Sequence, residues 1–155
     1  MSRATMTIEE IQANIGSEIG VSDWIEMGQE RINQFADVTH DHQFIHVDPE
    51  RAKAETPFGG TIAHGFLTLS LLAGMADGCL PTVANRAMGI NYGFEKLRFL
   101  SPVRSGSRVR ARFSLMACDE RRPKEYQLKY GVSVEIENFD KPALAAEWLV
   151  LAIVN

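Results

Sequence analysis

Alternation of apolar and polar residues dominates the carboxy-terminal half of the chain. Between positions 108 and 115, four apolar residues alternate with three arginines and a serine, and residues 126–137 repeat the same period of two. Such alternation predicts strands with one buried and one exposed face. Residues 88–100 also have an extended pattern, and residues 144–154 are almost continuously apolar, which predicts a central strand. A charged turn is expected at 119–124.

Helical patterns dominate the amino-terminal half. Thr7 and Glu10 form a capping-box pattern at the start of a short helix, and Gly16 is expected to end it. A strand is expected within residues 19–27. The next helix is predicted over residues 29–39 from the spacing of its apolar positions. Its inner face would be formed by Ile32, Phe35, Ala36 and Val38.

Two further helices follow. Asp48-Pro49 suits the cap and first position of a short helix that ends near Glu55. The segment from Ala63 to Cys79 carries no charge before Asp77, and its apolar residues occupy every side of a helical wheel, which predicts a helix enclosed by protein. The longest apolar run, Ile62 to Met75, is interrupted by His64, Thr68 and Ser70 and falls short of the roughly 20 residues needed to span a bilayer. The pattern therefore predicts an α+β fold in which antiparallel strands curl around one long buried helix.

Length and charge narrow the possible classes of protein. A chain of 155 residues with 45% hydrophobic residues is expected to form a single domain over residues 1–155. The net charge of −4 argues against nucleic acid as the main partner. Because the amino terminus lacks the apolar core of a signal peptide, we expect a cytoplasmic protein without a membrane partner. Cys79 and Cys118 have no metal-ligand spacing and are expected to be buried thiols rather than a disulfide.

Asp41 and His46 are the first candidate catalytic residues, five positions apart in a predicted loop. Addition or elimination of water beside a carbonyl needs one proton transfer at the α carbon and one at the β hydroxyl. A carboxylate and an imidazole can divide that work. The spacing alone also fits a structural role, in which Asp41 caps the next turn and His46 is an ordinary loop histidine.

Three glycines, Gly59, Gly60 and Gly65, surround the predicted start of the buried helix. The first N–H groups of a helix have no acceptor within the helix, and the helix dipole favours negative charge there. An enolate or thioester oxygen would be stabilised at that position. The alternative is that these glycines only permit tight turns and close packing.

Two other groups of side chains could bind a ligand. The four histidines together with Asp41 could suggest a zinc or iron site, but His40 and His42 flank Asp41 and need not face the same way, so no metal is expected. A set of basic residues could bind the phosphates of coenzyme A or of a carrier-protein arm, although a solvated strand face is the simpler interpretation. These residues are Lys96, Arg98, Arg104, Arg108, Arg110 and Arg112.

Three segments together resemble the MaoC-like (R)-specific enoyl-CoA hydratases, also called hydratase 2. The segments are FADVTHDHQFIHVDP at 35–49, FGGTIAHGFLTLSL at 58–71, and NYGFEKLRFLSPV at 91–103, followed by Gly106. The chain looks most similar to the branch that contains nodulation protein N-like proteins and mycobacterial 3-hydroxyacyl-thioester dehydratases. The joint pattern is more specific than any single segment, and it covers most of the chain.

The resemblance implies a hot-dog fold and a homodimer with substrate bound near the subunit interface. It implies no cofactor beyond the coenzyme A or acyl carrier protein that carries the acyl thioester. Asp41 and His46 would be the catalytic pair, and the N–H of Gly65 would be the oxyanion donor. His64 and Ser70 are expected to support this pair or to bind substrate.

One departure from the family pattern lies inside the catalytic loop. Many members have Asn-Pro where this chain has Gln43-Phe44. The resemblance therefore leads us to expect that Gln43 replaces an amide hydrogen bond that shapes the loop. Phe44 would narrow or line the acyl channel, which affects the preferred chain length.

The implied activity is the reversible hydration of trans-2-enoyl thioesters to (R)-3-hydroxyacyl thioesters. Two alternatives are compatible with the same fold: an acyl-CoA thioesterase and a non-catalytic acyl-thioester-binding protein. The Asp41–His46 pair argues against pure binding, and the pair followed by His64-Gly65 favours hydration over thioester hydrolysis. The sequence leaves open the acyl length and the choice between coenzyme A and acyl carrier protein.

Overall fold

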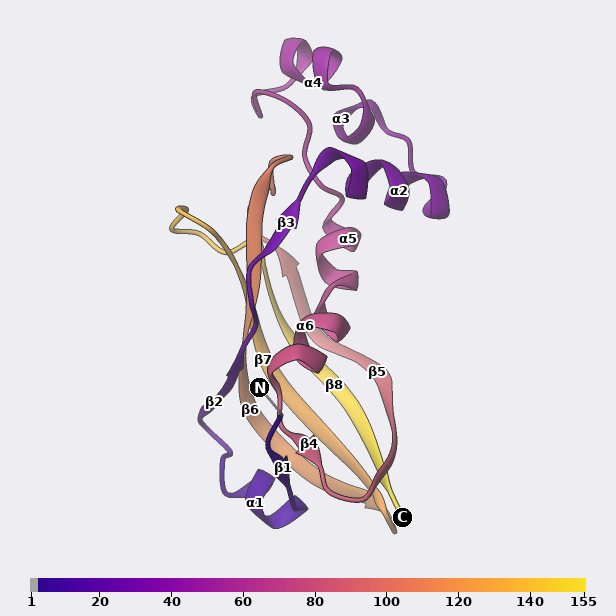
Figure 1. The fold of residues 1–155 in the computed structure, drawn as a ribbon, viewed down its shortest axis with the longest axis vertical. Helices are drawn as coiled ribbons and strands as arrows, with labels where there is room; N and C mark the ends of the chain where they lie inside the picture. The colour runs from indigo at the N-terminus through magenta and orange to yellow at the C-terminus, as the bar shows by residue number, and fades with distance from the viewer. Residues whose placement is uncertain (1–2) are drawn as a thin grey trace.

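A curved antiparallel sheet that lies along one side of a helical rod forms the centre of the computed structural model, which describes residues 3–155 (Figure 1). The strand order is β2-β6-β7-β8-β5, and β3 also pairs with β6. The strands of the sheet are β2 (Glu18–Val21), β3 (Ile25–Met27), β5 (Arg86–Phe99), β6 (Ser107–Arg122), β7 (Glu125–Ile136) and β8 (Leu144–Val154). A separate parallel pair is formed by β1 (Thr5–Met6) and β4 (Thr82–Val83).

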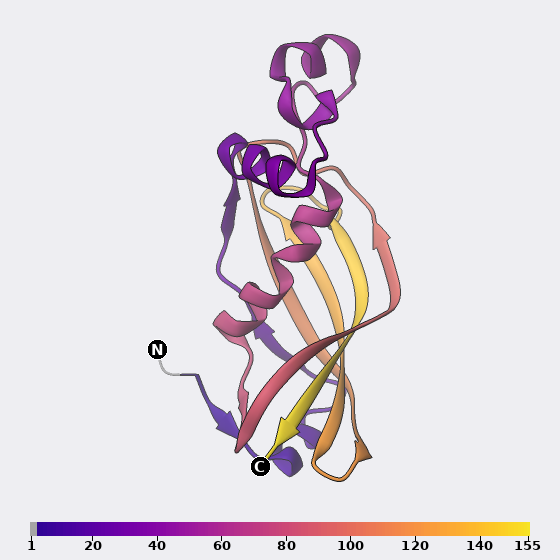
Figure 2. The ribbon, with the colours of Figure 1, turned by 90° about the vertical axis from the view of Figure 1, so that its right-hand side faces the viewer.

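The helices lie on the concave side of the sheet and at its two ends (Figure 1). They are α1 (Ile8–Gln12), α2 (Gln29–Thr39), α3 (Phe44–Val47), α4 (Pro49–Glu55), α5 (Gly65–Ser70) and α6 (Leu72–Cys79). Helix α1 lies at the end opposite to α2, α3 and α4 (Figure 1). The rod consists of α5 and α6, joined at Leu71, which keeps right-handed helical dihedral angles. At the end of the rod near α5, α2 crosses the sheet while α3 and α4 project beyond it (Figure 2).

The alternating pattern of the sequence is realised in the three long consecutive strands. On β6 the apolar residues of the expected alternation are fully buried, and on β7 the buried positions also occur at every second residue from Leu128 to Ile136. β8 lies between β7 and β5, which confirms the expected central strand. The alternation therefore identified the buried face of the sheet correctly.

The expected charged turn at 119–124 is shorter in the structure. β6 continues to Arg122, and β7 begins at Glu125, so only Pro123 and Lys124 form the turn. Charged side chains can occupy strands here because their backbone groups pair within the hairpin while the side chains reach water. A polar run thus predicted the turn but overestimated its length.

Two of the predicted helix starts are confirmed by side-chain caps. Thr7 and Glu10 exchange both capping-box hydrogen bonds, and Asp48 accepts a hydrogen bond from the backbone N–H of Arg51 at the start of α4. In α2 the predicted inner face is only partly correct, because Ile32 and Ala36 are buried but Val38 is 76% exposed. The short helix α3 was not predicted, since its four residues lie in a segment interpreted as a loop.

Burial of the rod is one-sided in the single chain. Leu67, Leu72 and Met75 are buried against the sheet, as predicted, whereas Phe66 is 65% exposed on the opposite side. The sheet covers only one face of the rod. The expected enclosure of the rod by protein on every side is therefore not seen in the single chain. The apolar residues on the other face remain uncovered within one chain.

Among residues 3–155, no helix is long and apolar enough to cross a membrane. The first two residues of the segment on which the signal-peptide expectation rests lie outside the described residues.

Cys79 and Cys118 are both free thiols, as expected. Cys118 is buried, and its burial raises the pKa of the thiol to about 11. Cys79 is only half-buried.

Candidate active site

The loop between α2 and α3 presents Asp41 to solvent. His40 ends α2 in the left-handed conformation with φ of 60°, which turns the chain away from the helix axis. Asp41 follows immediately and is exposed; its Oδ1 lies 3.4 Å from the backbone N–H of Gln43. The loop therefore leaves the Asp41 carboxylate largely free to interact with a ligand.

His46 lies in α3 and is 93% buried, with a relative exposure of 7%. Its Nδ1 is 2.7 Å from the carbonyl oxygen of Ile62. A carbonyl oxygen only accepts hydrogen bonds, so Nδ1 must carry the hydrogen, and Nε2 keeps a lone pair. The pKa of His46 lies below 6.5, mainly because the ring is buried. The hydrogen bond to Ile62 acts in the opposite direction and raises this pKa. Among the neighbouring groups, His64 lowers it further and Asp41 raises it. The ring is therefore suited to accept a proton near neutral pH.

His64 lies beside both members of the pair. It is 2% exposed, and its Nε2 is 3.0 Å from the backbone carbonyl oxygen of Asp41. Its ring stacks on His46, with centroids 3.8 Å apart and planes inclined by 25°. The second ring nitrogen, Nδ1, is buried and has no hydrogen-bond partner among the described residues. An unpaired buried polar atom is costly, by about 1–3 kcal/mol, and so calls for an explanation.

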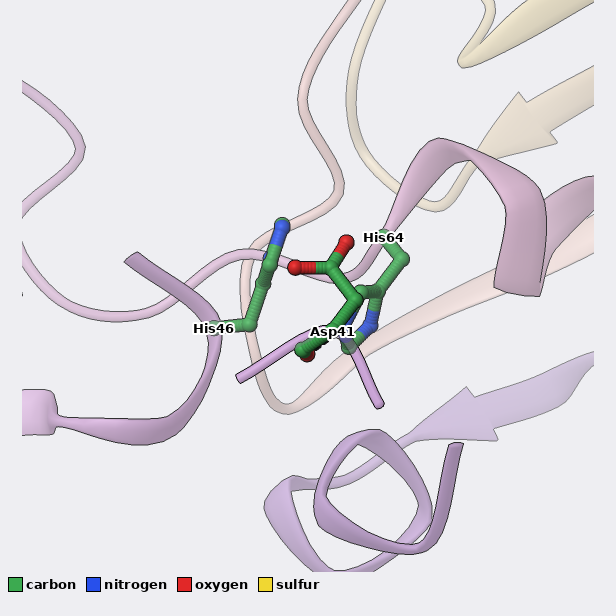
Figure 3. Close-up of side chains that lie close together, drawn as sticks. All are labelled: Asp41, His46 and His64. Carbon is green, nitrogen blue, oxygen red and sulfur yellow. Dashed lines mark hydrogen bonds between the residues drawn. The ribbon is translucent and has the colours of Figure 1, made fainter. Parts of the chain in front are cut away.

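Asp41, His46 and His64 form one cluster (Figure 3). Each offers one donor atom, and these three atoms all lie within 4.8 Å of one another. The cluster does not fit a metal ion well, because an ion lies close to the plane of each imidazole at about 2 Å from nitrogen. Two rings stacked at 3.8 Å with a 25° inclination have nearly parallel planes, so one ion cannot lie close to both planes at that distance. The arrangement therefore favours proton transfer over metal binding.

Gly65 is the first residue of α5 and borders the same site. Its N–H has no hydrogen-bond acceptor within residues 3–155, as expected for the first turn of a helix. Gly65 and His46 share the lining of a hollow of about 250 Å³, together with Thr68, Phe99 and Leu100 among others. An imidazole and a free N–H group thus face one space large enough for the reacting end of a thioester.

Phe99 is a contact residue that the sequence alone did not single out. A Cβ added at Gly65 would lie 2.9 Å from the Phe99 ring, so the ring packs directly on the glycine backbone. The two residues are far apart along the chain, and no local pattern could have shown that they meet. In the structure, Gly65 is therefore required for close packing as well as for its free N–H.

Of the candidate site residues, only His46 and Gly65 line the hollow; Asp41 and His64 lie beside His46, and the other three candidates are also outside the lining. Gln43 is exposed at the start of α3 and makes no side-chain cap. Phe44 is half-buried under the guanidinium of Arg51, whose Cζ is 3.9 Å from the ring centroid. Ser70 is exposed and donates a hydrogen bond of 2.6 Å to the carbonyl of Phe66 in its own helix. The structure does not bring these three side chains together with the Asp41–His46 pair.

Three arginines of the basic set, all on β6, are paired with carboxylates on the neighbouring strands or just beyond a strand end. The pairs are Arg108 with Glu137, Arg110 with Glu135, and Arg112 with both Glu135 and Glu18. Each arginine therefore already has a carboxylate partner across the sheet surface. This arrangement supports the interpretation of a solvated strand face over that of a phosphate site.

Comparison with known proteins identifies relatives over nearly the whole chain. Residues 10–136 match the protein family described as MaoC like domain. Nodulation protein N of Rhizobium meliloti is 54% identical over 97% of this chain and 93% of that protein. The 3-hydroxyacyl-thioester dehydratase Z of Mycobacterium tuberculosis is 46% identical over 96% of this chain and 97% of that protein.

Solved structures agree with these relatives in fold. The monoamine oxidase regulatory protein from Archaeoglobus has a TM-score of 0.81 and 28% identity, covering 100% of this chain and 99% of that chain. The (R)-hydratase from A. caviae involved in PHA biosynthesis has a TM-score of 0.67 and 26% identity, covering 87% and 96%. These similarities confirm the expected hot-dog fold.

Proposed function

Because the chain belongs to the MaoC-like dehydratase family, we propose that it catalyses the reversible hydration of trans-2-enoyl thioesters to (R)-3-hydroxyacyl thioesters. The observation that carries the proposal is the Asp41 carboxylate beside His46, which shares a hollow with the free N–H of Gly65. The dehydratase and (R)-hydratase named among the similar proteins support the reaction class and its stereochemistry.

In the proposed mechanism, the thioester carbonyl oxygen binds to the N–H of Gly65. Asp41 and the lone pair on Nε2 of His46 hold a water molecule, and the pair accepts one of its protons as its oxygen attacks the β carbon. Electrons move to the carbonyl oxygen, where the N–H of Gly65 and the helix dipole stabilise the enolate. A proton then passes from the pair to the α carbon, which completes the addition and restores the starting protonation. Dehydration follows the same steps in reverse.

The experiment that tests this function is a panel of enoyl-CoA substrates of increasing chain length. Hydration is followed by the loss of enoyl absorbance, starting with crotonyl-CoA, and the configuration of the product is determined with an (R)-specific dehydrogenase. Free thiol is measured in the same reactions. No hydration of any enoyl thioester, whether carried by coenzyme A or by acyl carrier protein, would exclude the proposal; thiol release alone would indicate a thioesterase, and binding without turnover a binding protein.

We further propose that the enzyme is a homodimer. Phe66 on the rod is exposed, and β5 is an edge strand with exposed apolar residues, among them Met88 and Tyr92. A second copy would cover the open face of the rod and pair with the unpartnered edge of the sheet. We expect sedimentation equilibrium to give the mass of two chains, and a monomer at micromolar concentration would contradict this expectation.

The pH dependence of the reaction follows from the state of His46. Burial lowers its pKa below 6.5, so the neutral ring persists below that pH. We therefore expect the acidic limb of the kcat/KM profile to have an apparent pKa below 6.5. The unfolded chain binds this proton near 6.5, so acidification from there towards the folded-state pKa also reduces stability. An NMR titration of His46 provides the check, and a limb above 6.5 would argue against His46 as the base.

A further inference from the structure

We propose that His64 is a positioning residue that holds the Asp41 loop, the His46 ring and the Gly65 N–H in one fixed arrangement. The proposal rests on the hydratase function proposed above and assigns His64 a specific mechanical role within it. His64 touches the loop, the second histidine and the helix start through three different parts of the same residue.

The first contact anchors the Asp41 loop. The Nε2 of His64 lies 3.0 Å from the backbone carbonyl oxygen of Asp41, 23 positions away in the chain. A carbonyl only accepts, so Nε2 must carry the hydrogen and donate it. Asp41 has a further hydrogen bond, which involves its side chain: the backbone N–H of Gln43 donates to Oδ1 over a long distance of 3.4 Å. The buried donor of His64 is therefore the stronger restraint on an otherwise exposed residue.

The second contact sets the plane of the His46 ring. The His64 ring contacts Phe35, at a centroid distance of 5.0 Å, and stacks on His46, at 3.8 Å. The hydrogen bond from His46 Nδ1 to the carbonyl of Ile62 fixes the tautomer, but it does not by itself fix the plane of the ring, which can still turn about the direction of this hydrogen bond. Stacking on the His64 ring restricts this rotation, so Nε2 of His46 is held in one direction.

The third contact links His64 to the oxyanion donor. His64 is the N-cap residue of α5, and its carbonyl accepts hydrogen bonds from Leu67 and Thr68 at 3.0 and 3.3 Å. Gly65 is the next residue, so a displacement of the His64 backbone also displaces the Gly65 N–H. One residue therefore couples the position of the acid–base pair to that of the oxyanion donor.

The burial of His64 distinguishes positioning from direct catalysis. Its Nδ1 is inaccessible to solvent and has no hydrogen-bond partner among residues 3–155, so this nitrogen does not reach substrate. If residue 64 only filled space in the core, an apolar aromatic residue would be more stable there than histidine, because an unpaired buried lone pair is unfavourable. The donor at Nε2 is what a histidine adds over phenylalanine at this place. The geometry therefore indicates that the hydrogen bond to Asp41 is the reason for a histidine here.

A pair of substitutions separates the donor from the ring. His64→Phe keeps an aromatic ring against His46 but removes the donor, whereas His64→Gln keeps an N–H near the Nε2 position but removes the stacked ring. We expect His64→Phe to lower kcat by about 10–10²-fold with KM changed less than about threefold, as for other residues that orient catalytic groups. The loss in His64→Gln is expected to be smaller, because the loop anchor is retained.

The NMR spectrum of His46 gives a readout that does not depend on turnover. In His64→Gln we expect its ring proton signals to move downfield, because the shielding by the stacked ring is lost. His42→Gln is the matched control: His42 is exposed, its Nε2 contacts Asp37 at 2.9 Å, and its replacement is expected to leave kcat and the His46 signals unchanged.

The outcomes separate this proposal from the function on which it rests. Unchanged kcat in folded His64→Phe, or unchanged His46 signals in His64→Gln, would overturn the positioning role. If His64→Phe does not fold, the kcat and the spectrum of His64→Gln decide. If the wild-type protein hydrates no enoyl thioester but the His46 signals still shift in His64→Gln, the proposed function is wrong while the positioning of His46 by His64 remains supported.

Discussion

Asp41→Asn and His46→Gln are each expected to lower kcat for enoyl-thioester hydration by at least about 10²-fold, which is the contribution typical of a positioned proton transfer. Asn keeps the size of Asp41 and its backbone contact to His64 but cannot accept a proton. Gln at position 46 can still donate to the carbonyl of Ile62, yet it lacks the basic lone pair that Nε2 of His46 presents. Both variants therefore remove the chemistry and preserve most of the packing.

Matched controls lie in the same loop and on the helix before it. Asp37→Asn and His42→Gln change the same residue types, and the exposed contact between these two side chains contributes little to stability. Initial rates at saturating crotonyl-CoA should fall in the Asp41→Asn and His46→Gln variants and stay unchanged in the two controls. Because the two groups are expected to act as a unit, the double variant should lose little more than the worse single one. A kcat within about threefold of wild type in either single variant would be incompatible with proton transfer by that residue.

Gly65→Ala is expected to produce the second large effect, a loss of kcat of about 10²-fold, similar to the removal of one oxyanion donor. The added Cβ would lie 2.9 Å from the Phe99 ring, which is closer than a carbon contact allows. Either the ring or the start of α5 must shift, and a shift of the helix start displaces the N–H from the thioester oxygen. Intrinsic helix propensity would by itself favour alanine, so the loss would be due to the contact.

Two variants test this explanation. Gly74→Ala lies in the same rod, where an added Cβ meets no atom within 4 Å, and it should retain activity. Gly65→Ala combined with Phe99→Leu relieves the contact and should recover part of the rate. No recovery in the folded double variant would show that the loss has another cause than the Phe99 ring.

The segments with a regular period were predicted with good accuracy. The alternation along β6 and β7 identified the buried face, because a strand exposes every second residue to the same environment. The Asp41–His46 spacing was visible because both residues lie in one short segment. Val38 was misassigned, because α2 crosses the end of the molecule and only a narrow stripe of it is covered. A helical pattern states which residues share a face but not how wide the covering surface is.

The sequence by itself determined most of the strands and helices, two helix caps, the candidate acid–base pair and the glycine at the helix start, since these depend on neighbours within a few positions. Only the tertiary structure decided how these parts act together. It placed His64 against Asp41 across 23 positions and put the Phe99 ring on Gly65. It also buried His46, and that burial lowers its pKa. Orientation, tautomer and desolvation arise from contacts between distant segments, and no local pattern specifies them.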